Sequence, residues 1–305
     1  MKTKYFVPKE KILEPGFLAI LRIFTINHGE TFRFLGLKHP VLQALLSPFL
    51  ILPGVYFTQT LVRINRRAGV EGFVPAMIWG LHRYYSPTEI HWSSNGSPGR
   101  VGPLLVVGNH PGLGDFPALL EALGRTDVRV IVKERELMTD LRHIIDRCIV
   151  IDESLSSKAR AITEAVNYMS SGGVVVIFPA GEIEEDPALV TWDGESILKP
   201  WFPIVDGIAR RCLKVGFDFA VLPTLVDRVY SVPPGLGSYV GSSKDASIRS
   251  GRAAIITMVT GIFRKTSIRV RFARFLPSAE ILSGNTKGEL TEEVRQRLKE
   301  FKEDL

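Results

Sequence analysis

The pattern of apolar and polar positions changes near residue 101. From that point to the C-terminus, short apolar runs rich in β-branched residues alternate with segments whose apolar residues recur at helical spacing. Short continuous apolar runs are typical of strands buried on both faces of a sheet. The alternation predicts an α/β fold with a mostly parallel sheet covered by helices. The predicted strands span residues 104–107, 128–132, 148–151, 174–178, 219–222 and 268–275.

The segments between these strands contain further elements. Helical spacing of apolar residues predicts helices over residues 134–145, 156–169 and 290–301. Pro223 is expected to end the strand at 219–222, and the Pro- and Gly-rich segment 231–238 is expected to form a long flexible loop. Ligands of parallel sheets bind at the carboxyl ends of the strands. The loops after the strands at 104–107 and 174–178 are therefore expected to face one another.

The first hundred residues have a different character. Residues 41–62 contain no charged side chain, and basic residues stand on both sides of this stretch. Its length is sufficient to cross a bilayer, which needs about 20 residues, but Pro48, Pro53 and Gly54 interrupt helical structure. The sequence therefore predicts a kinked or two-piece helix lying in the membrane interface. The alternative is an apolar hairpin packed on the main domain of a soluble protein.

Aromatic residues and a linker follow this stretch. An interfacial belt of aromatic side chains is expected from Phe73, Trp79, Tyr84, Tyr85 and Trp92. The Ser- and Gly-rich segment 93–99 predicts a linker into the next domain. The chain is thus expected to comprise an N-terminal membrane-associating segment over residues 1–100 and an α/β domain over residues 101–305.

The distribution of charge suits a membrane surface. The net charge is +6, and the basic excess lies in two regions: residues 1–83 contain eleven Lys or Arg and four Glu, and residues 244–275 contain eight Lys or Arg and one Asp. Two basic regions favour an anionic membrane. Nucleic acid is not expected as a partner, because aromatic residues are not interleaved with the basic ones. The protein is therefore predicted to associate with membrane lipids at the cytoplasmic face.

Several other chemistries are excluded by the sequence. Cys148 and Cys212 each sit among apolar residues, which predicts reduced, buried thiols. Neither cysteine has a nearby partner and no His-Glu-x-x-His sequence occurs, so no metal site is predicted. Residues 1–14 lack the apolar core of a secretory signal. The glycines near residue 110 do not form Gly-x-Gly-x-x-Gly, which argues against a dinucleotide-binding oxidoreductase.

One polar turn carries the main chemical signal. The apolar run at 104–107 is followed by Gly108-Asn109-His110-Pro111-Gly112-Leu113-Gly114-Asp115. Five residues is not a helical spacing, but a tight loop can bring the Asp115 carboxylate back to the His110 imidazole. The carboxylate would then accept from one ring nitrogen and leave the other as a general base. Two alternatives stand beside this: Asp115 as the N-cap of a helix, and His110 as a loop histidine that bonds locally.

A second turn, Phe178-Pro179-Ala180-Gly181-Glu182, follows the strand at 174–178. Together, the two turns resemble the glycerolipid acyltransferase family, the group around 1-acylglycerol-3-phosphate acyltransferase. That family carries a His-x4-Asp motif, here His110 and Asp115, and later a Phe-Pro-Glu-Gly motif, here Phe178 to Gly181. A lysine-containing block at 132–137 and a Val-Pro-like block at 221–223 occur in the family's order. The resemblance covers residues 103–226.

This resemblance implies a glycerol-3-phosphate acyltransferase-like fold and an O-acyltransferase of phospholipid biosynthesis. Such an enzyme moves a fatty acyl group from an acyl thioester, either acyl-CoA or acyl carrier protein, to a hydroxyl of a lysophospholipid or related lipid, with no cofactor besides that co-substrate. It implies His110 and Asp115 as catalytic residues. The implied substrate-binding residues are Asn109, Gly112, Gly114, Lys133, Phe178, Pro179, Gly181 and Glu182.

Two departures from the family pattern concern the acceptor. Ala180 replaces the family's motif glutamate, and an acid appears two places later as Glu182, as in a divergent branch that reads Phe-Pro-Ala-Gly-Glu. After its third strand the family tends to place an arginine that is tied to the acceptor's phosphate, whereas this chain has Asp152 and Glu153. The acceptor is therefore expected to differ from a simple glycerol phosphate.

The mechanism follows from what the chain lacks. No Gly-x-Ser-x-Gly nucleophile elbow is present, so we expect direct attack by the acceptor hydroxyl, with His110 as its base and Asp115 fixing the imidazole tautomer. Backbone N–H groups of residues 111–114 are candidates for oxyanion stabilisation. Gly181 would admit substrate close to the backbone, and Glu182 would hold an acceptor hydroxyl or amine. The rival functions are a thioester or lipid hydrolase using the same pair, and a non-catalytic membrane-binding protein.

Overall fold

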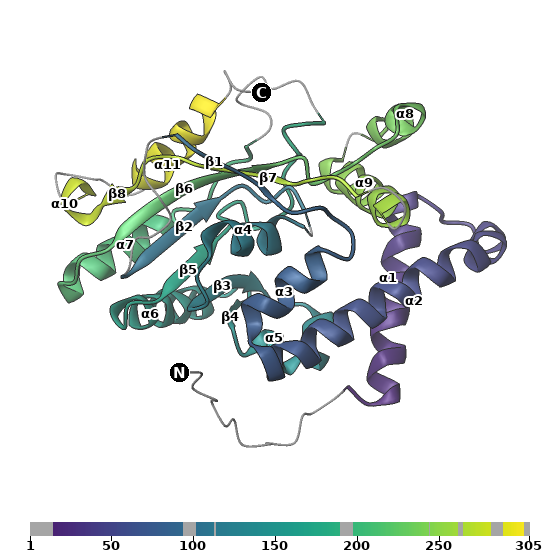
Figure 1. Ribbon diagram of the computed structural model, residues 1–305, viewed down its shortest axis with the longest axis horizontal. Helices are drawn as coiled ribbons and strands as arrows, with labels where there is room; N and C mark the ends of the chain where they lie inside the picture. The colour runs from purple at the N-terminus through teal and green to yellow at the C-terminus, as the bar shows by residue number, and fades with distance from the viewer. Residues whose placement is uncertain are drawn as a thin grey trace, which may run out of the picture.

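A sheet of eight strands lies at the centre of the computed structural model (Figure 1). The structure describes residues 15–93, 102–112, 114–189, 198–243, 245–261, 265–281 and 289–301. The segment 1–14, in which no signal was predicted, and the predicted linker beyond Ser93 lie outside the described residues. The strands are β1 (Glu89–Trp92), β2 (Leu104–Gly108), β3 (Val128–Lys133), β4 (Cys148–Ile151), β5 (Val174–Ile177), β6 (Ala220–Asp227), β7 (Arg269–Phe272) and β8 (Leu276–Pro277).

The pairing of these strands is mostly parallel. Their order is β1-β7-β6-β2-β5-β3-β4, with β8 paired to β6. All pairs from β6 to β4 are parallel, as is β1 with β7, whereas β7 and β8 run antiparallel to β6. The predicted α/β architecture is thereby confirmed, with every predicted strand in the sheet. The sequence did not predict β1, the strand at one edge of the sheet, which is formed by residues 89–92.

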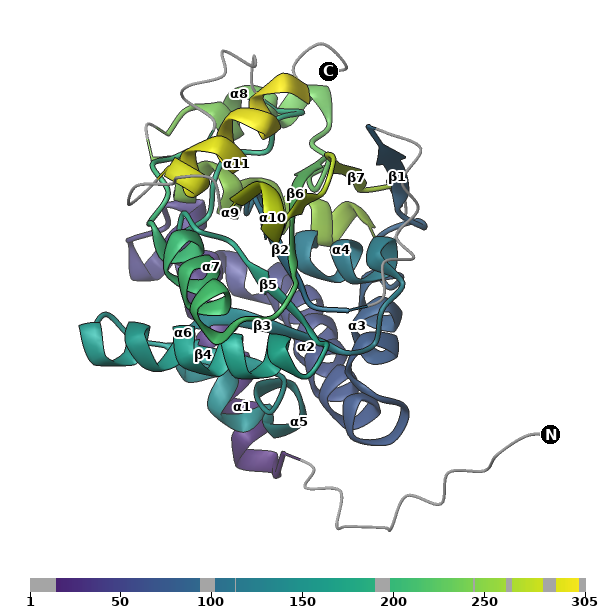
Figure 2. The same ribbon diagram turned by 90° about the vertical axis from the view of Figure 1, so that its left-hand side faces the viewer.

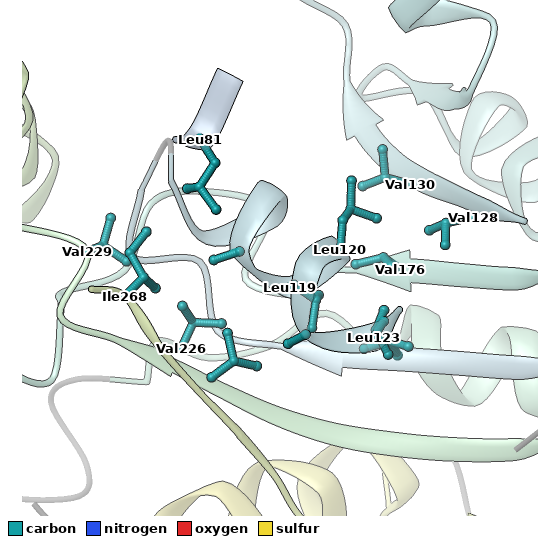
Figure 3. Close-up of a cluster of buried hydrophobic side chains, with 14 of the residues drawn as sticks. Leu81, Leu119, Leu120, Leu123, Val128, Val130, Val176, Val226, Val229 and Ile268 are labelled. Atoms are coloured by element: carbon teal, nitrogen blue, oxygen red, sulfur yellow. The ribbon is translucent and has the colours of Figure 1, made fainter. Parts of the chain in front are cut away.

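Alternate side chains of β2 face two different helical layers. Leu104 and Val106 belong to one core cluster, of which Figure 3 shows Leu120 of α4 and Val176 of β5. Leu105 and Val107 belong to a second cluster on the other face. Figure 2 shows α3 and α4 on one side of the sheet and α6 and α7 on the other. Each fully buried Leu or Val stabilises the fold by about 1.5–3 kcal/mol. These helices are α3 (Phe73–Leu81), α4 (Asp115–Leu123), α6 (Leu155–Ser170) and α7 (Ile204–Val215).

β6 continues through Pro223, so the prediction that this proline ends the strand is wrong. Pro223 lies at the junction of two antiparallel partners, because β8 pairs with Val221 and β7 pairs with Thr224. The proline gives up one donor there, and its carbonyl still accepts the N–H of Ala273 at 3.0 Å. The parallel pairing of β6 with β2 continues on the other side.

The helix predicted over 134–145 is two shorter elements, a 3-10 helix η1 (Glu136–Asp140) and α5 (Arg142–Ile145). The division has a tertiary cause. The side-chain oxygen of Asn65 accepts the N–H groups of His143 and Ile144 at 3.0 and 3.4 Å. A buried asparagine from another helix thus takes the free N–H groups at the start of α5, and a new helix begins there.

The segment predicted as a flexible loop, 231–238, is also partly helical. It contains a 3-10 helix η2 (Pro234–Leu236) and the start of α8 (Gly237–Gly241), and α9 (Ala246–Gly261) follows. The tail is as predicted, since α11 (Glu289–Lys299) packs its apolar stripe against the sheet; a further short helix, α10 (Ser278–Ile281), precedes it. α9 lies beside the N-terminal helices in Figure 1.

The N-terminal helices are α1 (Phe17–Leu35) and α2 (Pro40–Glu71). α2 is one continuous helix through Pro48 and Pro53, so a two-piece helix is not observed. α1 packs along it at Gly54, where an added Cβ would lie 3.1 Å from the ring of Phe24. The two helices therefore approach closely at the residue after Pro53.

The first half of α2 exposes apolar side chains. Phe49 and Leu52 are each 76% exposed, and Phe17 and Leu18 of α1 are exposed as well. Among the described residues, α2 is the one helix long and apolar enough to cross a membrane, and its most apolar window is almost unburied. Its second half differs, because Ile64 is buried within the domain.

The predicted aromatic belt is wrong for most of its members. Phe73, Tyr84 and Tyr85 are buried in the core, and Trp92 of β1 stacks on Phe272 with ring centroids 4.1 Å apart. These rings gain more from packing against the sheet and α4 than an interface would offer, because each buries a large apolar area. Among the described residues, exposed apolar side chains gather on α1 and the first half of α2, while single ones such as Leu155 and Phe202 lie elsewhere.

Candidate active site

The two predicted turns meet at the carboxyl edge of the sheet. β2 and β5 are neighbours, and Val107 pairs with Ile177, so both strands end at the same level. The loop after β2 begins at Asn109, which is fully buried. Its amide nitrogen donates to the carbonyl of Val226 at 2.8 Å, and its oxygen accepts the N–H of Val226 at 2.7 Å. Both polar groups of Asn109 thus tie the loop to β6.

His110 and Asp115 lie in direct contact. Nδ1 of His110 is 2.7 Å from Oδ2 of Asp115, and the aspartate side chain is 1% exposed. The same Oδ2 accepts the N–H of Gly112 at 2.9 Å, while Oδ1 accepts the N–H of Phe116 at 2.5 Å. The N-cap of α4 is Gly114 and Asp115 is the first helical residue. The alternative in which Asp115 caps the helix is therefore not observed.

The imidazole is held on a second side by Phe178. The two rings stack with centroids 4.8 Å apart and an interplanar angle of 22°. Phe116 meets Phe178 edge-on behind this pair. The His110 side chain remains 30% exposed, and its Nε2 has no hydrogen-bond partner among the residues that the structure describes. The structure thus brings His110 of the first turn and Phe178 of the second together, and leaves Nε2 of the imidazole open.

Charges around His110 favour the protonated imidazole. Burial by itself lowers the pKa of His110, but the carboxylate of Asp115, its hydrogen bond and the charge of Glu184 together outweigh burial and raise that pKa above its ordinary value. Arg135, an exposed cation in the loop after β3, acts in the opposite direction. A base with a raised pKa accepts a proton more readily and stays neutral at mildly alkaline pH.

Glu184 is a site residue that the sequence did not single out. Its Oε2 accepts the backbone N–H of His110 at 2.9 Å, and its Oε1 accepts the N–H of Lys199 at 2.9 Å and the indole N–H of Trp201 at 3.1 Å. Its own N–H donates to the carbonyl of His110 at 2.8 Å. Burial raises the pKa of Glu184 to about 7, although these hydrogen bonds oppose the rise.

The second turn places its remaining residues around Phe178. Gly181 has a φ of +68°, and its N–H donates to the carbonyl of Phe178 at 3.1 Å, which closes a tight turn. An added Cβ on Gly181 would lie 3.3 Å from the ring of Phe202, so this glycine packs against protein. Pro179 is buried, and its carbonyl accepts the N–H of Phe202 at 3.0 Å. Gly181 therefore serves the turn geometry.

Two predicted polar residues lie at the surface of this region. Glu182 is exposed and pairs with Nζ of Lys199 at 3.1 Å. Lys133, at the end of β3, pairs with Glu153 at 2.7 Å, and both side chains are largely exposed. Such exposed pairs stabilise a protein by about 0–1 kcal/mol, so both side chains can exchange these partners for a substrate.

The glycines of the first turn make room for aromatic side chains. A Cβ on Gly112 would collide with the hydroxyl of Tyr230, and one on Gly114 would lie 3.1 Å from the ring of Tyr85. Tyr230 donates its hydroxyl to the carbonyl of Pro111 at 2.5 Å. The Gly112 N–H, one of the predicted oxyanion donors, is bonded to Asp115 in this structure. Leu113, also in the predicted group, lies outside the described residues.

Comparison with known proteins supports an acyl-transfer site. Residues 90–226 match the model of the family described as Acyltransferase. No curated protein sequence matches the chain. Among solved structures, the chain is similar to the 1-acyl-sn-glycerophosphate acyltransferase PlsC from Thermotoga maritima, with 16% identity and a TM-score of 0.44 over 94% of this chain and 93% of that one. Within the described residues, no group of side chains is suited to hold a metal ion. The matched segment, residues 90–226, contains both motif turns.

Proposed function

We propose that the protein moves a fatty acyl group from an acyl thioester, acyl-CoA or acyl carrier protein, to a hydroxyl of a lysophospholipid or related lipid. The observation that carries this proposal is the contact between His110 and Asp115, which leaves Nε2 of the imidazole open at the carboxyl edge of the sheet. A match to the acyltransferase family over the segment that holds this pair supports it.

The reaction begins with the acceptor hydroxyl beside Nε2 of His110. As the hydroxyl oxygen attacks the thioester carbonyl carbon, its proton passes to Nε2 and the carbonyl becomes an oxyanion. The tetrahedral intermediate then collapses, the carbon–sulfur bond breaks, and the thiolate takes the proton back from the imidazolium. An ester and a free thiol result, with no acyl-enzyme and no change in oxidation state.

Asp115 acts on the imidazole in two ways. It accepts the Nδ1 proton, so that Nε2 is the basic nitrogen, and its charge stabilises the imidazolium that forms during attack. Its fixed position comes from the N–H groups of Gly112 and Phe116. Stacking on Phe178 restricts the ring to one plane. Positioning of this kind lowers the entropic part of the barrier.

Lipid substrates require access to a membrane, and we assign that contact to α1 and α2 lying in the interface at the cytoplasmic face. The exposed apolar part of α2 ends where its side chains enter the core near Thr58. Residues 40–57 span about 27 Å at ~1.5 Å per residue, short of the ~30 Å hydrocarbon layer. The basic excess of residues 1–83 favours an anionic leaflet.

The test supplies purified protein with mixed micelles of lysophospholipid and a radiolabelled acyl thioester, as acyl-CoA in one arm and as acyl carrier protein in another. We expect labelled diacyl phospholipid and free thiol in equal amounts. Labelled free fatty acid without acylated lipid would instead identify a hydrolase. Vesicle binding without turnover on any acceptor would identify a non-catalytic membrane-binding protein.

A further inference from the structure

Three consecutive acids after the second turn each contact a different partner. Glu184 bonds the main chain of His110. Glu185 pairs with Nε of Arg249 on α9 at 2.6 Å. Asp186, which is buried, accepts the N–H groups of Arg228 and Tyr230 at 2.9 and 3.1 Å. Of these three acids, Glu184 is the one bonded to the residue that carries the proposed base.

The contact between Glu184 and His110 is reciprocal. The carboxylate accepts the N–H of His110, and the N–H of Glu184 donates to the His110 carbonyl. Two hydrogen bonds in opposite directions fix both the position and the orientation of one peptide segment. His110 lies two residues after the end of β2, so its main chain is held by Asn109 and the sheet on one side and by Glu184 on the other.

Glu184 itself is fixed by partners from further along the chain. Its Oε1 accepts from the N–H of Lys199 and from the indole N–H of Trp201. Three donors therefore converge on two carboxylate oxygens in a fully buried site. A charged carboxylate satisfies all three donors, whereas a neutral side chain of the same shape carries one group that cannot accept.

We propose that Glu184 is a positioning residue for acyl transfer, which fixes the main chain of His110 through the two hydrogen bonds that join them. This inference rests on the proposed role of His110 as the general base. The charged groups facing His110 are Asp115 from α4, Glu184 and Arg135, and Glu184 in turn faces His110. Two carboxylates thus act on one imidazole, Asp115 through Nδ1 and Glu184 through the main chain and its charge.

The variant Glu184→Gln separates this role from simple space filling. The amide oxygen of glutamine can still accept from Lys199 and Trp201. Its NH2 group then faces the N–H of His110, and because both groups are donors, the hydrogen bond to the His110 main chain is lost. We expect kcat for acyl transfer to fall by about 10- to 100-fold with KM for the thioester unchanged. The acid limb of the pH profile should move to lower pH, because a negative charge beside the imidazole is lost.

A second readout does not depend on turnover. Titration of the His110 ring by NMR in detergent micelles should give a lower pKa in Glu184→Gln than in the unmodified protein. The matched control is Glu185→Gln, which removes a charge one residue away without a bond to His110 and should leave both the pKa of His110 and kcat unchanged. Either an unchanged pKa or an unchanged kcat in Glu184→Gln overturns the proposal.

A milder variant guards against loss of folding. Trp201→Phe removes one donor to Glu184 and keeps the carboxyl group. Loss of that donor favours the neutral form of Glu184. Both the pKa of His110 and kcat should therefore fall, as in Glu184→Gln, but by smaller amounts. No effect on either quantity in a folded Trp201→Phe protein would contradict the proposal. If the unmodified protein transfers no acyl group, the proposed function fails, and the NMR titration still decides whether Glu184 sets the basicity of His110.

Discussion

The Nδ1 atom of His110 lies 2.7 Å from Oδ2 of Asp115, although five residues separate them in the chain. A turn with two glycines makes the contact possible, because the N–H of Gly112 donates to the same carboxylate oxygen. The aspartate is the first residue of α4, and the histidine lies two residues after the end of β2. The pair is thus held by a strand and a helix, both anchored in the core.

Replacing Asp115 by Asn tests the tautomer argument. The amide would keep the shape of the carboxylate but lose its charge, and its NH2 group would face a donor on the turn or on the ring. We expect kcat to fall by about 10³-fold with little change in KM. The measurement is steady-state acyl transfer at saturating thioester, with thermal unfolding as the check on folding. A kcat within tenfold of the unmodified enzyme would argue against this role.

The pH dependence of kcat/KM reports the basicity of His110. The imidazole must be neutral to accept a proton, so activity is lost as the pH falls through its pKa. That pKa is raised above the ordinary 6.5, and the midpoint of the acid limb should therefore lie above pH 6.5. Neutral detergent micelles are the right medium, because anionic vesicles concentrate protons at their surface. A midpoint below 6.5 would contradict the assigned electrostatics.

Gly112→Ala tests the packing of the first turn. The added methyl would collide with the hydroxyl of Tyr230, so either the ring or the His110 loop must move. We expect kcat to fall by about 100-fold and the melting temperature to decrease. The double variant Gly112→Ala/Tyr230→Phe should recover part of both losses, because the nearest atom is removed. Additive losses in the double variant would show that the two residues do not share this contact.

The membrane contact can be tested without touching the site. Phe49 and Leu52 are both 76% exposed on α2, and replacing each by Asp should weaken co-sedimentation with anionic vesicles by about tenfold or more per residue. Leu155→Asp is the control, since Leu155 is 84% exposed at the start of α6. Transfer to a short-chain, water-soluble acceptor should be unaffected in all three variants. Equal vesicle binding by the α2 variants and the control would exclude α2 as the membrane contact.

The sheet was predictable because its central strands are buried on both faces. Runs such as residues 104–107 and 174–177 are apolar without alternation, and each ends in a turn containing Pro or Gly. Only the first half of β6 was predicted. The strand accommodates Pro223 because the proline lies between the residues that pair with β7 and those that pair with β8, and the sequence does not show where those strands lie. The split between η1 and α5 depends likewise on Asn65, a residue more than seventy positions away.

The site residues near strand ends were predictable from the sequence, whereas the residue whose role depends on distant contacts was not. His110 and Phe178 lie within two residues of the ends of β2 and β5, and Asp115 begins the helix after the first turn. Their approach to one another therefore follows from the sheet. Glu184 stands in the run Glu182-Ile183-Glu184-Glu185-Asp186, in which any acid is equally plausible from the sequence. Its role is decided by burial and by the donors of Lys199 and Trp201, and the sequence contains no periodic signal for either.

The most direct test of the account is the rate of acyl transfer by His110→Ala, measured as labelled diacyl lipid formed from an acyl thioester and lysophospholipid. His110 contacts Phe178 and Asp115 at the edge of the sheet, outside the two helical layers of the core, so the variant should fold and bind vesicles normally. We expect its turnover to fall to the uncatalysed background. Turnover within tenfold of the unmodified enzyme, in a protein that still folds, would contradict His110 as the general base.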